Sequence, residues 1–279
     1  MPQWGTRIAF VGGGTMAEAM VRGLLERRLV TPARITVSGP RRERRAELVK
    51  AYRVKAVASN VEAARAADVV VLSVKPQMLQ RVMGELRGRL GPDQLVLSIV
   101  AGASSDALRA GLDHASIVRA MPNTPAQVAM GITVWWATPS VGAGQRDVAR
   151  AMLAALGEEI AVEQEEQVDM ATALSGTGPS YVFLLMEALV DDGVHLGFSR
   201  RVAEELVLRT VEGSALFARR SGRHLAELRN MVTSPGGTSS AALYQLEKGG
   251  LRTVLSKAVY AAYVRTRELG DAAERATKD

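Results

Sequence analysis

Short, continuously apolar segments alternate with helical segments over the first half of the chain. Five of them are apolar along most of their length instead of alternating, as strands buried on both faces are: 7–11, 34–38, 68–74, 95–101 and 116–121. Between them, segments such as 15–29 and 77–90 repeat apolar residues at helical spacing. This alternation predicts an α/β doubly wound, parallel sheet, with segments 131–137 and 159–162 extending its edge.

The strand pattern stops near residue 164, and long segments of helical period punctuated by glycine follow. We therefore expect two domains, a doubly wound domain over residues 1–164 and an all-helical domain over 165–279. The helical half carries apolar stripes, for example Leu184, Leu185, Ala188 and Leu189, for which one chain offers little cover. These stripes predict an obligate homodimer.

Composition excludes several classes of function. The net charge is +6, but the arginines are spread among glutamates instead of forming one block, and aromatic residues make up 4%, so nucleic-acid binding is not expected. We expect no membrane-spanning segment and no signal peptide, which predicts a cytoplasmic protein. With no cysteine and with histidines scattered at 114, 195 and 224, no metal site is expected.

A glycine-rich turn directly follows the first predicted strand. Gly12, Gly14 and Ala17 fit the pattern G-x-G-x-x-G/A at the start of a predicted helix. Gly12 permits a sharp turn, Gly14 lets the backbone approach a pyrophosphate, and Ala17 allows the helix to pack closely on the strand. In this strand, turn and helix context the pattern predicts a dinucleotide site, in which N–H groups at the helix start face the phosphates.

The end of the second predicted strand bears on the choice of dinucleotide. Sites for NAD place an acidic residue there, whereas this chain reads Ser38, Gly39, Pro40, Arg41, Arg42. Arginine with a serine hydroxyl can bind a 2′-phosphate through charge-assisted hydrogen bonds, which favours NADPH, with NADH as a possible second cofactor. The alternative is that the arginines begin a solvated helix.

Three further segments end predicted strands at the same carboxyl edge, where ligands of open α/β sheets bind: 73–77, 99–104 and 119–127. Lys75 is placed to touch a ribose or a phosphate, or to cap a turn. Pro122 and Pro125 make the third segment a rigid loop, suited to lie under a nicotinamide ring.

A second cluster lies far along the chain, where Ser234, Pro235, Gly236 and Gly237 precede a helix predicted to begin near Thr238. This hydroxyl-rich turn lies far from the glycine-rich motif, which indicates that a second group is bound there.

Taken together, the motifs VGGGTMA, SVKPQ, MPNTPA, LSGTGPSYVF and VTSPGGTSSAALYQLEKGG resemble those of the pyrroline-5-carboxylate reductases, in the family's order over nearly the whole chain. The resemblance implies a Rossmann domain followed by a helical dimerisation and substrate-binding domain. It implies hydride transfer from NAD(P)H to the C=N carbon of 1-pyrroline-5-carboxylate, giving L-proline. It also implies a homodimer as the minimum unit and, as a larger assembly, a decamer of five dimers.

The resemblance assigns residues to roles. Ser239 matches the family position that hydrogen-bonds the ring nitrogen, and Thr238 and Ser239 are the implied catalytic pair. The implied substrate contacts are Glu165, Ser234, Gly236, Gly237, Thr238 and Ser239. In that role, backbone N–H groups and the positive end of the helix dipole would bind the substrate's carboxylate, with the hydroxyls of Ser234, Thr238 and Ser239 around it. The implied cofactor contacts are Gly12, Gly13, Gly14, Thr15, Met16, Ser38, Gly39, Arg41, Arg42, Asn60, Val74, Lys75, Pro76, Val100, Ala101 and Asn123. An acid that begins a helix is the other interpretation of Glu165.

Two alternatives remain at this stage. A related dehydrogenase of the Rossmann-plus-helical class would carry a catalytic lysine on the long helix, but segment 175–193 contains no lysine. A regulator that senses NADPH without turnover would have no need of the second cluster around Gly236.

Overall fold

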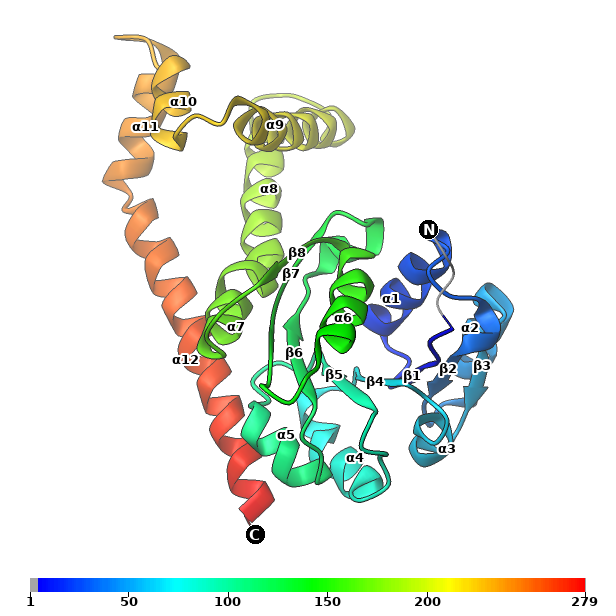
Figure 1. The fold of residues 1–279 in the computed structure, drawn as a ribbon. Helices are drawn as coiled ribbons and strands as arrows, with labels where there is room; N and C mark the ends of the chain where they lie inside the picture. Colours follow the sequence, from blue (N-terminus) through cyan, green and yellow to red (C-terminus); the bar gives the residue numbers. More distant parts are fainter. Residues whose placement is uncertain (1–4, 279) are drawn as a thin grey trace. The chain divides into compact units, whose positions relative to one another are not determined.

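The computed structural model describes residues 5–278, with side chains through residue 271. The chain divides into two compact units (Figure 1). One unit runs to Thr177 and also takes in the chain from Ala261 onward, and the other is Gly178–Tyr260. The first unit therefore ends later than the domain boundary expected at 164/165, and it includes the end of the last helix.

The first unit contains an eight-stranded sheet in the order β3-β2-β1-β4-β5-β6-β7-β8. The strands are β1 Ile8–Val11, β2 Ile35–Ser38, β3 Lys55–Val57, β4 Val69–Leu72, β5 Leu95–Ser98, β6 Ile117–Met121, β7 Gly131–Ala137 and β8 Gly157–Ala161. Neighbouring strands from β3 to β6 are parallel, as predicted. β7 runs antiparallel to β6, and β8 is parallel to β7.

The reversal at β7 follows from the length of its connection. Residues 122–130 join β6 to β7, and a parallel return needs a crossover of a dozen residues or more. The expectation of a parallel sheet therefore holds for six strands, and the two strands at the β8 edge run the other way.

Helices cover both faces of this sheet. They are α1 Thr15–Glu26, α2 Arg42–Tyr52, α3 Asn60–Ala64, α4 Leu79–Leu86, α5 Ser105–Leu112, α6 Ala143–Ala154 and α7 Glu166–Ala171. Short helical turns are η1 Pro32–Arg34, η2 Pro76–Met78, η3 Thr124–Val128 and η4 Thr172–Gly176. Buried residues of α1, α2 and α6 form one apolar cluster, and those of α3, α4 and α5 form a second cluster on the opposite face.

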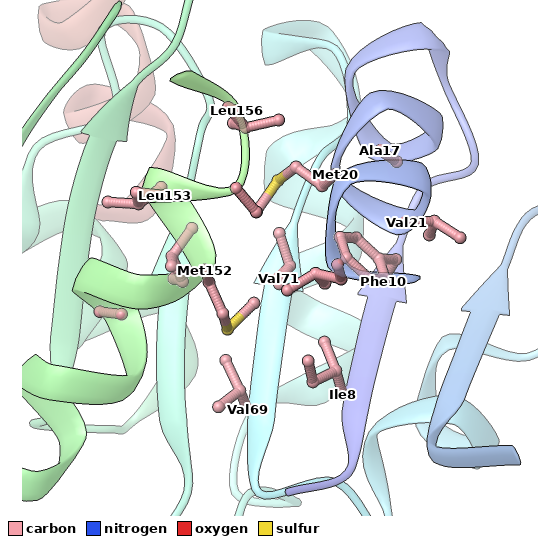
Figure 2. Close-up of a cluster of buried hydrophobic side chains, with 14 of the residues drawn as sticks. Ile8, Phe10, Ala17, Met20, Val21, Val69, Val71, Met152, Leu153 and Leu156 are labelled. Atoms are coloured by element: carbon pink, nitrogen blue, oxygen red, sulfur yellow. The ribbon is translucent and has the colours of Figure 1, made fainter. Parts of the chain in front are cut away.

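The central strands are almost entirely apolar because both of their faces are buried. Ile8 and Phe10 belong to the first cluster, whereas Ala9 and Val11 belong to the second. Figure 2 shows the first cluster, where Phe10 of β1 and side chains of β4 lie beside Met20 of α1 and helix α6. This two-sided core holds the carboxyl ends of the strands in fixed positions.

The second unit is helical. It comprises α8 Gly178–His195, α9 Arg200–Ser221, α10 Leu225–Met231, α11 Thr238–Lys248 and the first part of α12 Leu251–Lys278. Its buried residues are few: Val190 on α8 and Ala203 on α9 are buried, while Phe183 and Leu184 are 60% and 67% exposed. The unit therefore leaves much of its apolar surface uncovered within one chain.

A π-helical turn, η4, precedes the long helix α8. The N–H of Thr177 donates to the carbonyl of Thr172 at 2.8 Å, which is the wider π spacing. Pro179 lacks an N–H and so cannot make the ordinary bond one turn back, which explains why α-helical pairing is interrupted here.

The C-terminal end of α12 packs against the loop that follows β5. A Cβ added to Gly270 would lie 2.6 Å from the carbonyl oxygen of Gly102, and one added to Gly102 would lie 2.8 Å from the carbonyl oxygen of Thr266. This close approach of two backbones explains why the last part of α12 belongs with the first unit.

Candidate functional site

The glycine-rich turn has the geometry that a pyrophosphate needs. Gly12 has φ +106°, and a Cβ there would lie 2.6 Å from the carbonyl oxygen of Ser73, so only glycine fits. Gly14 is the N-cap residue of α1, no side chain caps that helix, and a Cβ on Gly14 would meet nothing within 4 Å. Open space beside an uncapped helix start is what a bound phosphate group requires, so these residues fit a dinucleotide.

The neighbouring residues support the same turn. Ala17 is buried against the sheet, as the motif predicts. The N–H of Gly12 donates to the carbonyl of Ser38 at 3.1 Å, and the hydroxyl of Ser73 donates to the carbonyl of Gly12 at 2.8 Å. Gly13 and Met16 are half-buried and Thr15 is exposed.

At the end of β2, two of the implied cofactor contacts, Ser38 and Asn60, have side chains that bond to other residues of the protein. The hydroxyl of Ser38 is fully buried and donates to Asn60 Oδ1 at 2.7 Å, while Asn60 Nδ2 donates to Glu85 at 2.7 Å. These two side chains therefore bond to the protein itself and fix the end of the strand. Arg41 and Arg42 are exposed beyond the half-buried Gly39.

At the other strand ends of this edge, some of the implied cofactor contacts are exposed and others are buried. Lys75 is exposed, between half-buried Val74 and Pro76. Val100 is buried and Ala101 half-buried, and they line a crevice of about 220 Å³ together with Pro76, Gln77, Leu79, Gln80, Ala103 and Leu269.

Asn123 is also buried, at the end of β6. Its Oδ1 accepts from the N–H of Ile132 at 3.0 Å, which ties the proline-containing loop to the start of β7. The side chain of Asn123 thereby makes the loop rigid, as the two prolines do.

Glu165 takes part in an ion-pair cluster around the buried Arg119. Its carboxylate accepts from the backbone N–H of Ser105 at 2.6 Å, from the hydroxyl of Ser105 and from Arg119 Nη1 at 2.6 Å. Arg119 Nη2 donates to Asp169 at 2.7 Å. Both oxygens of Glu165 thus bond to the chain, and the cluster joins β6 to α5 and α7.

The hydroxyl-rich segment of the second unit forms a tight turn before α11. Gly236 has φ +71°, and the N–H of Gly237 donates to the carbonyl of Ser234 at 3.1 Å. Gly237 is the N-cap residue of α11, which no side chain caps. Ser234 and Thr238 are exposed and Ser239 is half-buried, so hydroxyl groups and uncapped N–H groups share one helix start.

Sequence comparison identifies the family. Residues 165–269 match the family model for pyrroline-5-carboxylate reductase dimerisation, and residues 7–102 match that for NADP oxidoreductase, coenzyme F420-dependent. The pyrroline-5-carboxylate reductase of Synechocystis sp. is 42% identical over 95% of this chain and 98% of its own length. The chain belongs to the pyrroline-5-carboxylate reductase family.

Further members of the pyrroline-5-carboxylate reductase family agree in sequence and in structure. The Pseudomonas aeruginosa enzyme is 42% identical over 95% of this chain and 97% of its own. The solved structure from Coxiella burnetii has a TM-score of 0.86 at 38% identity, covering 95% of this chain and 98% of that one. The Plasmodium falciparum structure, with NADP bound, has a TM-score of 0.88 at 29% identity, covering 96% and 100%.

The dimerisation match bears on one apolar segment. Helical residues Glu166–His195 have a mean hydropathy of 1.2 in a window that is 11% buried, so length and composition alone would allow a membrane span. This differs from the expectation that no segment reaches that length. The segment lies within the residues that match the dimerisation model of the pyrroline-5-carboxylate reductase family.

Several contacts of the site were not foreseen from the sequence. Arg44 donates to the carbonyl of Gly13, and Arg45 donates to the carbonyls of Gly39 and Pro40. The cluster of Arg119 with Asp169 was also missed. The run of arginines after β2 was the available signal for the first two, whereas Arg119 gave none, being one charge in an apolar strand.

Proposed function

We propose that this protein reduces 1-pyrroline-5-carboxylate to L-proline, with NADPH as the favoured cofactor and NADH as a possible one. The observation that carries the proposal is the 42% identity to a pyrroline-5-carboxylate reductase over 95% of the chain. The first unit offers a dinucleotide turn at Gly12 and Gly14, and NADP is bound in a related structure.

The substrate carries one carboxylate and one ring nitrogen. We infer that the uncapped start of α11 holds the carboxylate, through backbone N–H groups following Gly236 and Gly237 and the hydroxyls of Ser234 and Thr238. Each hydrogen bond there has a charged acceptor, which makes it stronger than one between neutral groups. The positive end of the helix dipole adds to this attraction.

Ser239 lies one residue further along α11 and is half-buried. We infer that its hydroxyl orients the ring nitrogen, together with Thr238. A serine hydroxyl is a weak acid at neutral pH, so Ser239 would position the imine and relay a proton through water instead of donating its own proton outright.

The bound nicotinamide would supply the hydride, and residues of the chain would hold the cofactor and the substrate in position for its transfer. The glycine-rich turn and the start of α1 would hold the pyrophosphate, and the loop with Pro122, Asn123 and Pro125 would form a rigid surface below the ring. For Glu165 the proposed substrate contact competes with its bonds to Ser105 and Arg119.

We also propose that residues 1–164 act as the NAD(P)-binding domain and 165–279 as the dimerisation and substrate-binding domain. The support is that the dimerisation family model begins at residue 165. A homodimer would cover the exposed apolar residues of α8 and α9, and the resemblance extends this to a decamer of five dimers in the cytoplasm. Sedimentation as a monomer at micromolar concentration would count against the dimer.

The reaction is tested by following the absorbance of NADPH with and without 1-pyrroline-5-carboxylate. We expect oxidation that depends on the substrate and yields proline. The variant Thr238→Ala/Ser239→Ala should lose at least about tenfold in kcat/KM, because each lost bond to a charged ligand costs about 1.5–3 kcal/mol. Ser240→Ala, which removes a neighbouring hydroxyl, is the matched control. A double variant as active as wild type would refute the proposed substrate site.

A further inference from the structure

The arginine segment, residues 41–45, carries four arginines directly after β2, and their contacts differ. Arg41 and Arg42 are exposed, and within residues 5–278 their side chains make no hydrogen bond or ion pair. Arg45 Nη1 donates to the carbonyl of Gly39 at 2.6 Å. Arg44 is half-buried and contacts the glycine-rich turn itself. These differences indicate that the four residues have different roles.

Two side chains of helix α2, one helical turn apart, contact Gly13. Arg44 Nε donates to the carbonyl oxygen of Gly13 at 2.8 Å. A Cβ on Gly13 would lie 3.0 Å from Leu48 Cδ1, so Leu48 packs closely against the same residue. Ser73 contacts Gly12 from the other side of the turn, with its hydroxyl 2.8 Å from the carbonyl oxygen of Gly12. The turn is therefore held on both sides, and Gly14 is left facing open space.

The charge of Arg44 is already balanced within the protein. Its Nη2 pairs with Glu18 of α1, and its Nη1 lies 3.0 Å from Glu47. The hydroxyl of Tyr52 donates to Glu18 Oε1 at 2.9 Å. Burial alone would raise the pKa of Glu18, but the hydrogen bonds from Arg44 and Tyr52 outweigh it and hold that pKa below its ordinary value. The carboxylate is therefore charged at neutral pH and keeps the guanidinium in place.

We infer that Arg44 is a positioning residue that fixes the glycine-rich turn for the pyrophosphate. The exposed Arg41 and Arg42, which the sequence already favours as contacts of the 2′-phosphate, serve as the comparison. This inference rests on the proposed function, since it concerns the cofactor of that reaction. When the turn is already held in its binding shape, less conformational entropy is lost as the cofactor binds. The pyrophosphate that the turn binds is the same in NADPH and NADH. Arg44 should consequently serve both cofactors equally, whereas Arg41 and Arg42 should distinguish them.

Direct titration of the full-length protein with each cofactor, without substrate, tests this division. We compare wild type, Arg44→Met and Arg41→Met/Arg42→Met by calorimetry. Arg44→Met should weaken NADPH and NADH by the same factor, about tenfold, the size of one hydrogen bond from a charged group. The double variant should weaken NADPH by about tenfold or more and change NADH by less than about twofold.

Two further variants serve as controls. Arg109→Met removes one positive charge from an exposed pair on α5 and should change neither affinity. Arg44→Lys keeps the charge beside Glu18 but has one nitrogen in place of three, so it cannot also reach Gly13, and it should weaken both cofactors as Arg44→Met does. This second variant carries the test if Arg44→Met does not fold, as judged by its thermal midpoint.

The outcomes are distinct. If Arg44→Met or Arg44→Lys weakened NADPH alone, Arg44 would be a phosphate ligand and the inference would be wrong. If both bound the two cofactors as wild type does, the network would only support the fold, which also overturns it. A wild-type protein that bound neither cofactor would overturn the proposed function and, with it, this inference.

Discussion

Replacing Arg119 with methionine removes a guanidinium group whose side chain is 4% exposed and which lies 2.6 Å from Glu165 and 2.7 Å from Asp169. The methionine fills much of the same space, so the change removes a charge without opening a large cavity. Two carboxylates then lie close together with no cation between them. The variant therefore isolates the contribution of this buried charge to folding.

The cost follows from burial. Removing one partner of a buried ion pair destabilises a protein by about 3–5 kcal/mol, because the remaining charge stays desolvated. Glu165 and Asp169 are each 21% exposed, so water reaches part of both carboxylates and the lower figure applies, about 3 kcal/mol. For a chain of this size that corresponds to a fall in Tm of about 6–12 °C.

The assay is thermal and urea unfolding at neutral pH, with protein concentration held fixed because a dimer gains stability by mass action. Arg109→Met is the control: it lies 3.5 Å from Asp106 in an exposed pair and should change the free energy of unfolding by less than about 0.5 kcal/mol. Combining Arg119→Met with Glu165→Gln and Asp169→Asn should recover much of the loss, since no unpaired charge remains.

If Arg119→Met unfolded at the wild-type temperature, the cluster would not stabilise the fold, and the reasoning from burial would be refuted. Glu165→Gln separates the two interpretations of that residue. A structural role predicts lower stability with KM for the substrate unchanged, whereas a substrate contact predicts a higher KM at unchanged stability. The two measurements together decide the role of Glu165.

Three other predictions concern the first unit. Gly12→Ala should abolish NADPH binding in a calorimetric titration, because its Cβ would lie 2.6 Å from the Ser73 carbonyl oxygen; tight binding would contradict this. Glu18 has a lowered pKa in the folded state, so its contribution to stability is present above its unfolded pKa and is lost as pH falls through the folded one; Glu18→Gln should therefore flatten the acid limb of a Tm-against-pH curve. Gly270→Ala should raise KM for NADPH, because its Cβ would lie 2.6 Å from the carbonyl oxygen of Gly102 and would displace the loop that carries Val100 and Ala101, two implied cofactor contacts. Kinetics identical to wild type would exclude this coupling between α12 and the cofactor site.

Much of the sheet could be predicted because strands buried on both faces leave a continuous apolar pattern. β1 and β2 appear within one residue of the predicted ends. β3 was missed because its three residues, Lys55–Val57, include an exposed lysine and form no apolar run. The direction of β7 could not come from its own composition, since it depends on the length of the connection to β6.

The functional site also has parts that the sequence predicted and parts that it did not. The glycine-rich turn was predictable because each glycine answers a local need, such as the positive φ of Gly12. The partners of Ser38 and Glu165 were not, because Asn60 and Ser105 lie 22 and 60 residues away in the chain and meet them only through the fold. Local rules specify backbone shape, whereas side-chain pairing depends on which strands become neighbours.

The last helix begins in one compact unit and ends in the other, which limits how the protein can be divided experimentally. A fragment cut after Thr177 would lack the stretch from Ala261 that lies against Gly102, and would expose the loop beside Val100 and Ala101 to water. Such a fragment should show weaker protection of that loop in hydrogen exchange. A separately added peptide covering the end of α12 should bind the fragment and restore the protection of that loop.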